Sequence, residues 1–205
     1  MTLAFALDAA AVFVFALTGA LAASRAQLDI VGFLFFAALT AVGGGTIRDL
    51  LLDRNPVFWI SEPVVLLIAA AAAVLVFFSA HLVESRAQWL AWLDAAALSI
   101  AVPAGLAVAL ATGQSGFIAP IIGVLTGTFG GLMRDVVANE VPMVLRQGEL
   151  YVTAAFLGAS AGWWVSGYLG TLPALVVAGL VTFLLRAGSL AFGWRLPVYK
   201  SRPPR

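Results

Sequence analysis

Hydrophobic residues occur in seven long segments along this 205-residue chain, separated by short stretches in which polar and charged residues gather. An apolar segment of roughly 20 residues is long enough to cross a membrane as a helix. A membrane β-barrel would instead show short segments of alternating polarity, which this sequence lacks. The pattern predicts an all-α integral membrane protein with seven transmembrane helices. The expected spans are residues 9–23, 30–52, 63–82, 92–110, 117–138, 150–169 and 172–192.

Composition supports the membrane assignment and narrows the function. Hydrophobic residues make up 62% of the chain and charged residues 10%, with a mean hydropathy of +1.05, which leaves too little polar surface for a soluble globule of this length. The sequence contains no cysteine, phosphate-binding loop, HExxH motif or nucleophile elbow. We therefore expect no enzymatic activity, no cofactor, no fixed metal site and no nucleic-acid partner.

Basic residues are distributed unevenly between the two sides of the predicted membrane domain. With the N-terminus outside, Arg48 and Arg54 fall on the outer side and nine basic residues fall on the inner side. Leaving out Arg48 and Arg134, which lie near membrane depth, still gives one outside and eight inside. Positive-inside bias therefore predicts N-out and C-in, with residues 195–205 as a basic cytoplasmic tail. Within it, residues 199–205 are expected to be a disordered anchor beside the anionic headgroups. The nine are Arg25, Arg86, Arg134, Arg146, Arg186, Arg195, Lys200, Arg202 and Arg205.

Two clusters of glycines and charged residues interrupt the apolar segments. The clusters are Gly43, Gly44, Gly45, Arg48 and Asp49, and then Gly130, Gly131, Arg134 and Asp135. The two Arg-Asp pairs lie 86 residues apart, as the difference between positions 48 and 134 shows. Glycine weakens a helix, and Arg and Asp are costly to place in lipid. Two clusters in register therefore indicate a duplicated, membrane-buried polar site.

The offset of 86 residues extends along the chain without a gap. Further matching pairs are Asp8 and Asp94, Gly19 and Gly105, Thr40 and Thr126, and Pro56 and Pro142. Each predicted repeat, residues 7–83 and 93–169, contains three spans, and an odd number of spans makes the second copy enter the membrane from the opposite side. The sequence thus predicts two inverted three-helix repeats, followed by residues 172–192 as an unpaired seventh helix.

The glycine clusters lie late in the second and fifth spans, where a kink or an unwound turn would expose backbone carbonyls at membrane depth. Such carbonyls are tolerated only where they face protein or water, and they attract cations. The Arg-Asp pairs follow within about one helical turn. Nearby hydroxyls come from Thr40, Thr46, Thr126 and Thr128. Together these groups are candidates for lining a polar path.

Both features also have a purely structural interpretation. Glycines in membrane helices often serve close packing, and Gly123, Gly127 and Gly131 have the spacing of two overlapping GxxxG motifs. An Arg-Asp pair at a helix end can anchor the helix at headgroup level or bridge to another element, including the aspartate of the opposite repeat. Because glycines and charges recur together in both halves, we favour a pore role combined with packing.

Two other features have alternative interpretations. Asp8 precedes the first predicted span and Asp94 lies at the start of the fourth, and both fit helix N-caps better than ion ligands. A face of small residues on the sixth span fits close contact with another helix, either within the protomer or between protomers. Its members are Ala154, Gly158, Gly162 and Ser166.

The motifs of both halves resemble the prokaryotic members of the trimeric intracellular cation (TRIC) channel family over about residues 7–160. In the first half, the similar residues are Leu7, Asp8, Gly19, Ala20, Asp29 to Gly32, Gly43 to Gly45, Arg48 to Leu51 and Pro56. In the second half, they are Gly123, Gly127, Gly130, Gly131, Arg134 to Val136, Glu140 to Pro142 and Glu149 to Tyr151. Related bacterial sequences are also described as glycine transporters.

The resemblance implies a seven-helix protomer of two inverted repeats that assembles as a homotrimer in the prokaryotic inner membrane, with one pore in each protomer. The second and fifth helices, kinked at their glycines, would flank a pore in which potassium binds only transiently. Membrane lipid would be a further partner. The lysines that eukaryotic relatives use for lipid binding have no match here, since Lys200 is the only lysine.

We therefore expect a monovalent cation channel in which carbonyls, hydroxyls, Asp49 and Asp135 partly replace the hydration shell of the ion. The alternative is a secondary transporter of a small zwitterion such as glycine, with the same broken helices forming an occluded site. A membrane scaffold without transport would leave the charged pairs at membrane depth unexplained. Phe129 stands where the first repeat has Gly43, and we expect this asymmetry to mark the gate.

Overall fold

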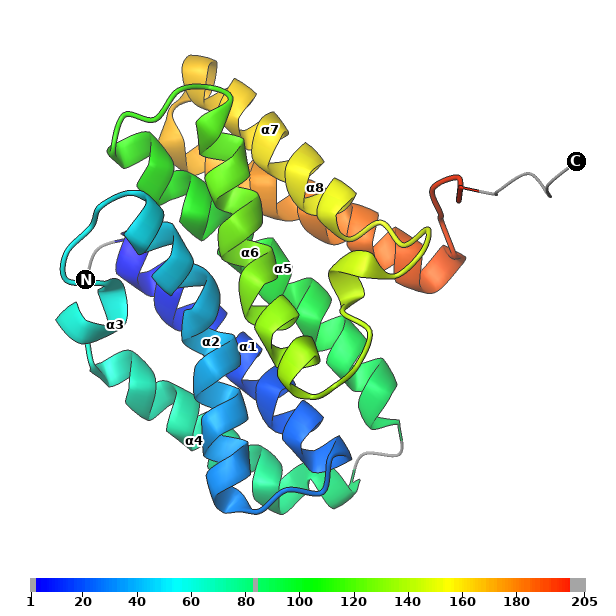
Figure 1. Cartoon of the computed structure of the whole chain (residues 1–205). Coiled ribbons are helices and arrows are strands. Elements are labelled where there is room, and N and C mark those ends of the chain that lie inside the picture. The colour runs from blue at the N-terminus through cyan, green and yellow to red at the C-terminus, as the bar shows by residue number, and fades with distance from the viewer. Residues whose placement is uncertain (1–2, 83–84, 200–205) are drawn as a thin grey trace, which may run out of the picture.

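The computed structural model describes residues 3–82 and 85–199, which form a bundle of α-helices (Figure 1). The elements are α1 (Leu3–Arg25), α2 (Ile30–Leu51), α3 (Phe58–Ser61), α4 (Val64–Ser79), η1 (Ala80–Leu82), α5 (Arg86–Ala111), α6 (Ile118–Val137), η2 (Met143–Leu145), α7 (Val152–Leu169) and α8 (Thr171–Phe192). Five helical segments are long and apolar enough to cross a membrane: α1, α2, α4 with η1, α5 and α8. The chain is therefore an all-helical, multi-pass membrane protein.

Each of the seven predicted spans corresponds to one long helix, but the number of membrane crossings stays a prediction. Helices α6 and α7 are not among the five segments that satisfy the length and hydropathy criteria. Helix α6 carries Arg134 and Asp135, and both helices are rich in glycine, serine or threonine. Many of these small and polar residues are buried against other helices, so they lower the mean hydropathy without facing lipid.

Helices α1 and α5 both begin six residues earlier than the predicted spans 9–23 and 92–110. Asp8 and Asp94 consequently lie inside these helices, so the interpretation of both as N-caps is wrong. The reason is that each carboxylate pairs with an arginine of another helix, and its charge therefore does not mark a helix end.

The bundle is organised around α1 and α5, which pack against each other. Helix α1 also contacts α2 and α4, and α5 contacts α6, α7 and α8. Helices α2 and α6 pack together and connect the two groups. In Figure 1, α1 starts near the end of α5, so these two neighbours run in opposite directions. At an offset of 86 residues, α5, α6 and α7 occupy the positions of α1, α2 and α4.

Glycines allow the backbones of α2 and α6 to come into contact. A Cβ atom at Gly44 would overlap the carbonyl oxygen of Thr126, and one at Gly130 would overlap the carbonyl oxygen of Thr40. A Cβ atom at Gly43 would lie 2.9 Å from Met133 Sδ. Both helices remain α-helical through these glycines, so the expected unwound segment is not confirmed. Close packing, the structural interpretation, explains why side chains are absent here.

The other small-residue faces also pack within the protomer. On α6, a Cβ atom at Gly123 would lie 3.0 Å from Val102 O, and Gly127 faces the same residue of α5. On α7, a Cβ atom at Gly162 would lie 2.7 Å from Ala174 O of α8, and Gly158 also faces α8. The face on α7 is therefore used inside the chain.

Part of the predicted tail has a defined place. Leu196 N donates to Gly148 O at 2.8 Å, and Glu149 pairs with Arg195 as an isolated antiparallel bridge. Arg195, Leu196 and Val198 therefore lie against the α6–α7 connection. Residues 200–205 of the predicted tail lie outside the described residues.

Candidate functional site

The first polar cluster joins the C-terminal end of α2 to α1. The side chain of Arg48 is fully buried, and its NH1 donates to Asp8 Oδ1 at 2.7 Å. Its Nε donates to Asp49 Oδ1 at 2.8 Å. Two carboxylates thus neutralise one buried guanidinium, as a charge in a low-dielectric interior requires.

Asp49 also fixes the segment that follows α2. Its Oδ1 accepts from Arg54 NH1 and its Oδ2 accepts from the backbone N–H of Phe58, each at 2.8 Å. The ring of Phe58 in turn covers the Arg48 guanidinium, whose carbon lies 5.3 Å from the ring centre. All the bonds of Asp49 therefore serve to position α3 and Arg48.

The second polar cluster repeats this layout at the C-terminal end of α6. Arg134 NH1 donates to Asp94 Oδ1 at 2.8 Å, and Nε donates to Asp135 Oδ1 at 2.8 Å. Asp135 Oδ2 accepts from Met143 N at 2.8 Å, as Asp49 does from Phe58. Each arginine thus pairs with aspartates of its own repeat, so the alternative in which it bridges to the aspartate of the opposite repeat is wrong.

The two clusters differ in their access to solvent. The side chain of Asp8 is 13% exposed, whereas that of Asp94 is 0% exposed. Arg134 NH1 also donates to Thr18 Oγ1 at 2.9 Å, a bond for which the first cluster has no counterpart because Ala104 stands 86 residues after Thr18. The first cluster is therefore open on one side, and the second is enclosed.

A vestibule of about 200 Å³ leads to Asp8 from the surface. It is lined by Phe5, Asp8, Arg54, Pro56, Phe58, Ser61 and Glu62. Asp8 and Phe58 also line a second, smaller cavity deeper in the bundle. The two spaces thus adjoin at these side chains.

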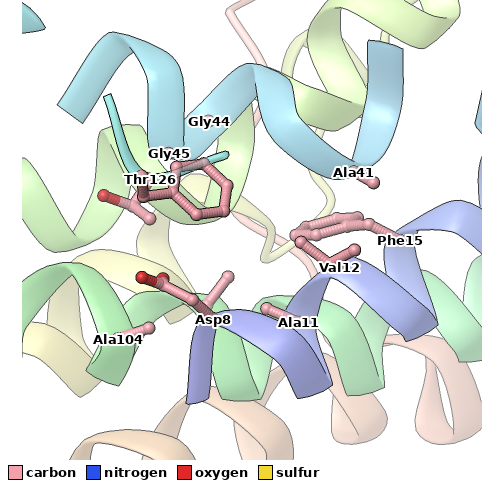
Figure 2. Close-up of a pocket in the computed structure, with 11 residues that line it drawn as sticks. Asp8, Ala11, Val12, Phe15, Ala41, Gly44, Gly45, Ala104 and Thr126 are labelled. Carbon is pink, nitrogen blue, oxygen red and sulfur yellow. The ribbon is translucent and has the colours of Figure 1, made fainter. Parts of the chain in front are cut away.

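The deeper cavity lies between α1, α2, α5 and α6 (Figure 2). Its volume of about 10 Å³ is close to the least space that one water molecule needs. Figure 2 shows Asp8 and Thr126 on one side of it and Val12 and Phe15 on the other. Its remaining lining residues are Ala11, Ala41, Gly44, Gly45, Phe58, Ala101 and Ala104.

The candidate hydroxyls are all bonded within their own helices. Thr40, Thr46, Thr126 and Thr128 each donate to the carbonyl oxygen four residues earlier, at 2.7 to 2.8 Å. Thr46 also accepts from Trp59 Nε1 at 2.9 Å. Thr126 is the member of this set that lines the deeper cavity, where its oxygen retains accepting capacity.

Most of the remaining candidates lie outside the two spaces. Gly44 and Gly45 line the deeper cavity, but Gly43, Gly130 and Gly131 are not among its lining residues. Asp49 and Asp135 are committed to arginine and backbone bonds. Phe129 is half-buried on α6, and its predicted role as a gate rests on the sequence asymmetry alone.

One buried group escaped the sequence prediction. Arg186 was expected to be an inner loop charge, but it lies within α8 with a fully buried side chain. Glu149 and Tyr151 contact it from the start of α7. The available signal was its position inside the predicted span 172–192, because an arginine at membrane depth calls for a partner.

Comparison of the sequence with known proteins matches one family model and several bacterial membrane proteins. A family model described as glycine transporter matches residues 5–81 and 91–167, two segments that are again 86 residues apart. The UPF0126 inner membrane protein YadS of Escherichia coli (strain K12) is 37% identical over 202 residues, covering 96% of both chains. A UPF0126 membrane protein of Vibrio cholerae is 37% identical over 201 residues, covering 97% of this chain and 83% of the relative.

Solved structures of TRIC channels have the same fold. A TRIC trimeric intracellular cation channel orthologue from Rhodobacter sphaeroides is 45% identical, with a TM-score of 0.90 and coverage of 94% of this chain and 100% of that chain. A prokaryotic TRIC channel crystallised in 0.5 M KCl is 31% identical, with a TM-score of 0.88 and coverage of 93% and 96%. The chain therefore belongs to the prokaryotic TRIC family, whose relatives are also described as glycine transporters.

Proposed function

We propose that the protein is a potassium-permeable, monovalent cation channel with a pore inside each protomer. The observation that carries the proposal is the pair of adjoining spaces that meet at Asp8 and lead from the surface to the contact between α2 and α6. Similarity to solved structures described as cation channels supports the same function.

The charge of the vestibule favours cations. Asp8, Asp49 and Glu62 carry three negative charges, and Arg48 and Arg54, which pair with Asp8 and Asp49, carry two positive charges, which leaves a net charge of −1 here. A cation that enters would meet a net negative potential, because like charges repel and opposite charges attract across the few ångströms of this space. Beyond Asp8 it would meet the hydroxyl of Thr126.

The glycines of α2 and α6 flank the narrow part of this path. Gly44 and Gly45 line the deeper cavity, and Gly44 contacts the backbone of α6 at Thr126. We infer that potassium is coordinated there only transiently, by oxygens that partly replace its hydration shell. A small relative movement of α2 and α6 would then be enough to widen the path.

A transporter of a small zwitterion such as glycine is the second candidate. The family description supports it, and so does the presence of both charge signs in a vestibule of about 200 Å³. A carboxylate would need Arg54, however, and that guanidinium already donates to Asp49. The channel is therefore the better proposal.

Planar bilayer recording of the purified protein in a potassium gradient tests the proposal. We expect unitary potassium currents. Asp8→Asn should lower these currents about fivefold at low salt, because an ion 4 Å from the lost carboxylate, in water-like surroundings, loses about 1 kcal/mol of attraction. Asp29→Asn, an exposed carboxylate at the start of α2, is the matched control. Absence of current at every voltage, together with saturable glycine uptake into liposomes, would refute the channel and support the transporter.

The assembly and orientation are proposed on the same basis. We expect a homotrimer, in contact with membrane lipid, with the N-terminus outside and the C-terminus inside. The small-residue face of α7 is used within the chain, so the trimer contact must lie elsewhere. Mass measurement of the detergent-solubilised protein tests the trimer, and a monomer in mild detergent and in nanodiscs would contradict it.

A further inference from the structure

Arg186 is a fully buried arginine on α8, the helix without a counterpart in the other half of the chain. Its NH1 lies 2.8 Å from Glu149 Oε2, and its guanidinium carbon lies 5.0 Å from the centre of the Tyr151 ring. An ionised side chain at membrane depth is costly and is retained where it has a function. The proposed pore leaves this one without a role.

Tyr151 connects Arg186 to the second polar cluster. A Cβ atom at Gly131 would lie 3.2 Å from the Tyr151 hydroxyl, 3.3 Å from Asp94 Oδ1 and 3.5 Å from Arg134 NH2, so these three groups meet at one point. The ring of Tyr151 therefore separates Arg186 from the carboxylate that corresponds to Asp8. In the first half, Val65 occupies the position of Tyr151 and Pro63 that of Glu149.

The polar groups around Tyr151 are incompletely bonded. Within residues 3–82 and 85–199, the three nitrogens of the Arg186 guanidinium and Arg134 NH2 have no hydrogen-bond partner. The contact between Arg186 and Glu149 is thus an ion pair without an aligned hydrogen bond. Arg186 is therefore held against Glu149 by ion pairing and against Tyr151 by stacking, and its unpaired buried donors make this position costly. Such a contact can be exchanged for hydration when the helix moves.

The C-terminal segment holds the loop of Glu149 against the end of α8. Leu150 N donates to Ser189 Oγ at 3.2 Å, and Ser189 Oγ donates to Trp194 O at 3.1 Å. Leu196 bonds to Gly148 on the other side of Glu149. The end of α8 can therefore move away from this loop, and Arg186 away from Glu149 and Tyr151, only when these bonds break.

We propose that Arg186, Glu149 and Tyr151 form a gate that closes the second end of the pore; this inference rests on the proposed channel function. The first end of the pore, at the cluster of Asp8 and Arg48, reaches solvent through Asp8. At the second end, at the cluster of Asp94 and Arg134, the equivalent carboxylate, Asp94, is sealed behind Tyr151. When α8 moves Arg186 away from Tyr151, the ring can turn and Asp94 becomes accessible to water and to a cation. Arg186 acts here through Tyr151 and does not touch the ion.

Single-channel recording of Arg186→Gln tests the gate. We expect the open probability to rise about fivefold or more, because the contact that stabilises the closed state is removed. The unitary conductance should stay unchanged, because the path at Asp8 is intact. Arg146→Gln is the matched control, since Arg146 lies 4.0 Å from Glu149 at the surface and is 38% exposed. An equal rise in the control, or a change in conductance without a change in open probability, would overturn the gate.

A disulfide tests the same gate without removing Arg186. The chain has no cysteine, so Leu150→Cys with Ser189→Cys can be introduced alone to bind the loop to α8. Oxidation should abolish openings and reduction should restore them; currents that persist in the fully crosslinked protein would overturn the proposal. If neither the wild-type protein nor any variant conducts, the channel function itself fails. Conduction by the wild type with no effect of Arg186→Gln or of the crosslink refutes the gate alone.

Discussion

Asp8 and Asp94 occupy equivalent positions in the two halves, so replacing each by asparagine compares one interaction in two environments. Asp94→Asn removes a carboxylate from the enclosed cluster, where Asp94 and Arg134 are both 0% exposed. Asp8→Asn removes the same group from the cluster that solvent reaches, where Asp8 is 13% exposed. We predict that the first change destabilises the fold far more than the second.

The magnitudes follow from what each arginine retains. Removing one partner of a buried ion pair costs about 3–5 kcal/mol. Arg134 keeps Asp135 at 2.8 Å, which places the expected loss near the lower end, at about 3 kcal/mol. Near Asp8, water can replace part of the lost interaction with Arg48, so a loss of about 1 kcal/mol is expected. For a chain of about 200 residues, these values correspond to falls in Tm of about 6–12 °C and about 2–4 °C.

Thermal unfolding in detergent, followed by the fluorescence of the six tryptophans, measures both shifts. Asp29→Asn is the control, because Asp29 is an exposed N-cap that accepts from Gly32 N, and asparagine caps a helix about as well. Its Tm should stay within about 1 °C of the wild type. Equal shifts for Asp8→Asn and Asp94→Asn, or a larger shift for Asp8→Asn, would refute the view that the two halves differ in solvent access.

Two further predictions concern packing and orientation. Gly44→Ala should lower the free energy of unfolding by about 1–3 kcal/mol, because its Cβ would overlap the Thr126 carbonyl. In the control Gly167→Ala, no atom lies within 4 Å of the added Cβ, so the thermal midpoint should stay unchanged or rise slightly. Equal effects of the two substitutions would contradict the close contact of α2 and α6. In intact cells, a membrane-impermeant maleimide should label the S115C protein and spare the Q147C protein, and the reverse pattern would invert the proposed orientation.

The sequence predicted the long helices well because each apolar run exceeds the length that a membrane span requires. It placed the starts of α1 and α5 too late because charged and polar residues, Asp8 in the first case and Arg86 and Gln88 in the second, looked like boundaries of apolar runs. A charge ends a span only when it has to reach water. The signal that Asp8 and Asp94 each have a partner was available: Asp8 and Arg48 are 40 residues apart, and so are Asp94 and Arg134.

The function of the glycines could not be settled from the sequence. A kinked helix and a close helix contact both need a residue without a side chain, so the same glycine pattern fits both. What distinguishes them is the atom opposite each glycine, such as the Thr126 carbonyl opposite Gly44, and that atom comes from a helix 82 residues further along the chain. The solvent access of each cluster likewise depends on neighbours that the repeat alignment does not reveal.

The equivalent residues Thr18 and Ala104 show how two halves with the same helix arrangement can differ in the solvent access of their polar clusters. Thr18 donates to Phe15 O, accepts from Arg134 NH1 and helps to enclose the second cluster; Ala104, its counterpart, has no hydroxyl and lines the deeper cavity near Asp8. Ala104→Thr should therefore fill a cavity of only about 10 Å³ and lower the unitary potassium current. The same substitution at Ala111, at the exposed end of α5, should leave the current unchanged. A stable A104T protein with wild-type current would show that ions do not pass this cavity, and the path would then have to lie outside the space between α1, α2, α5 and α6.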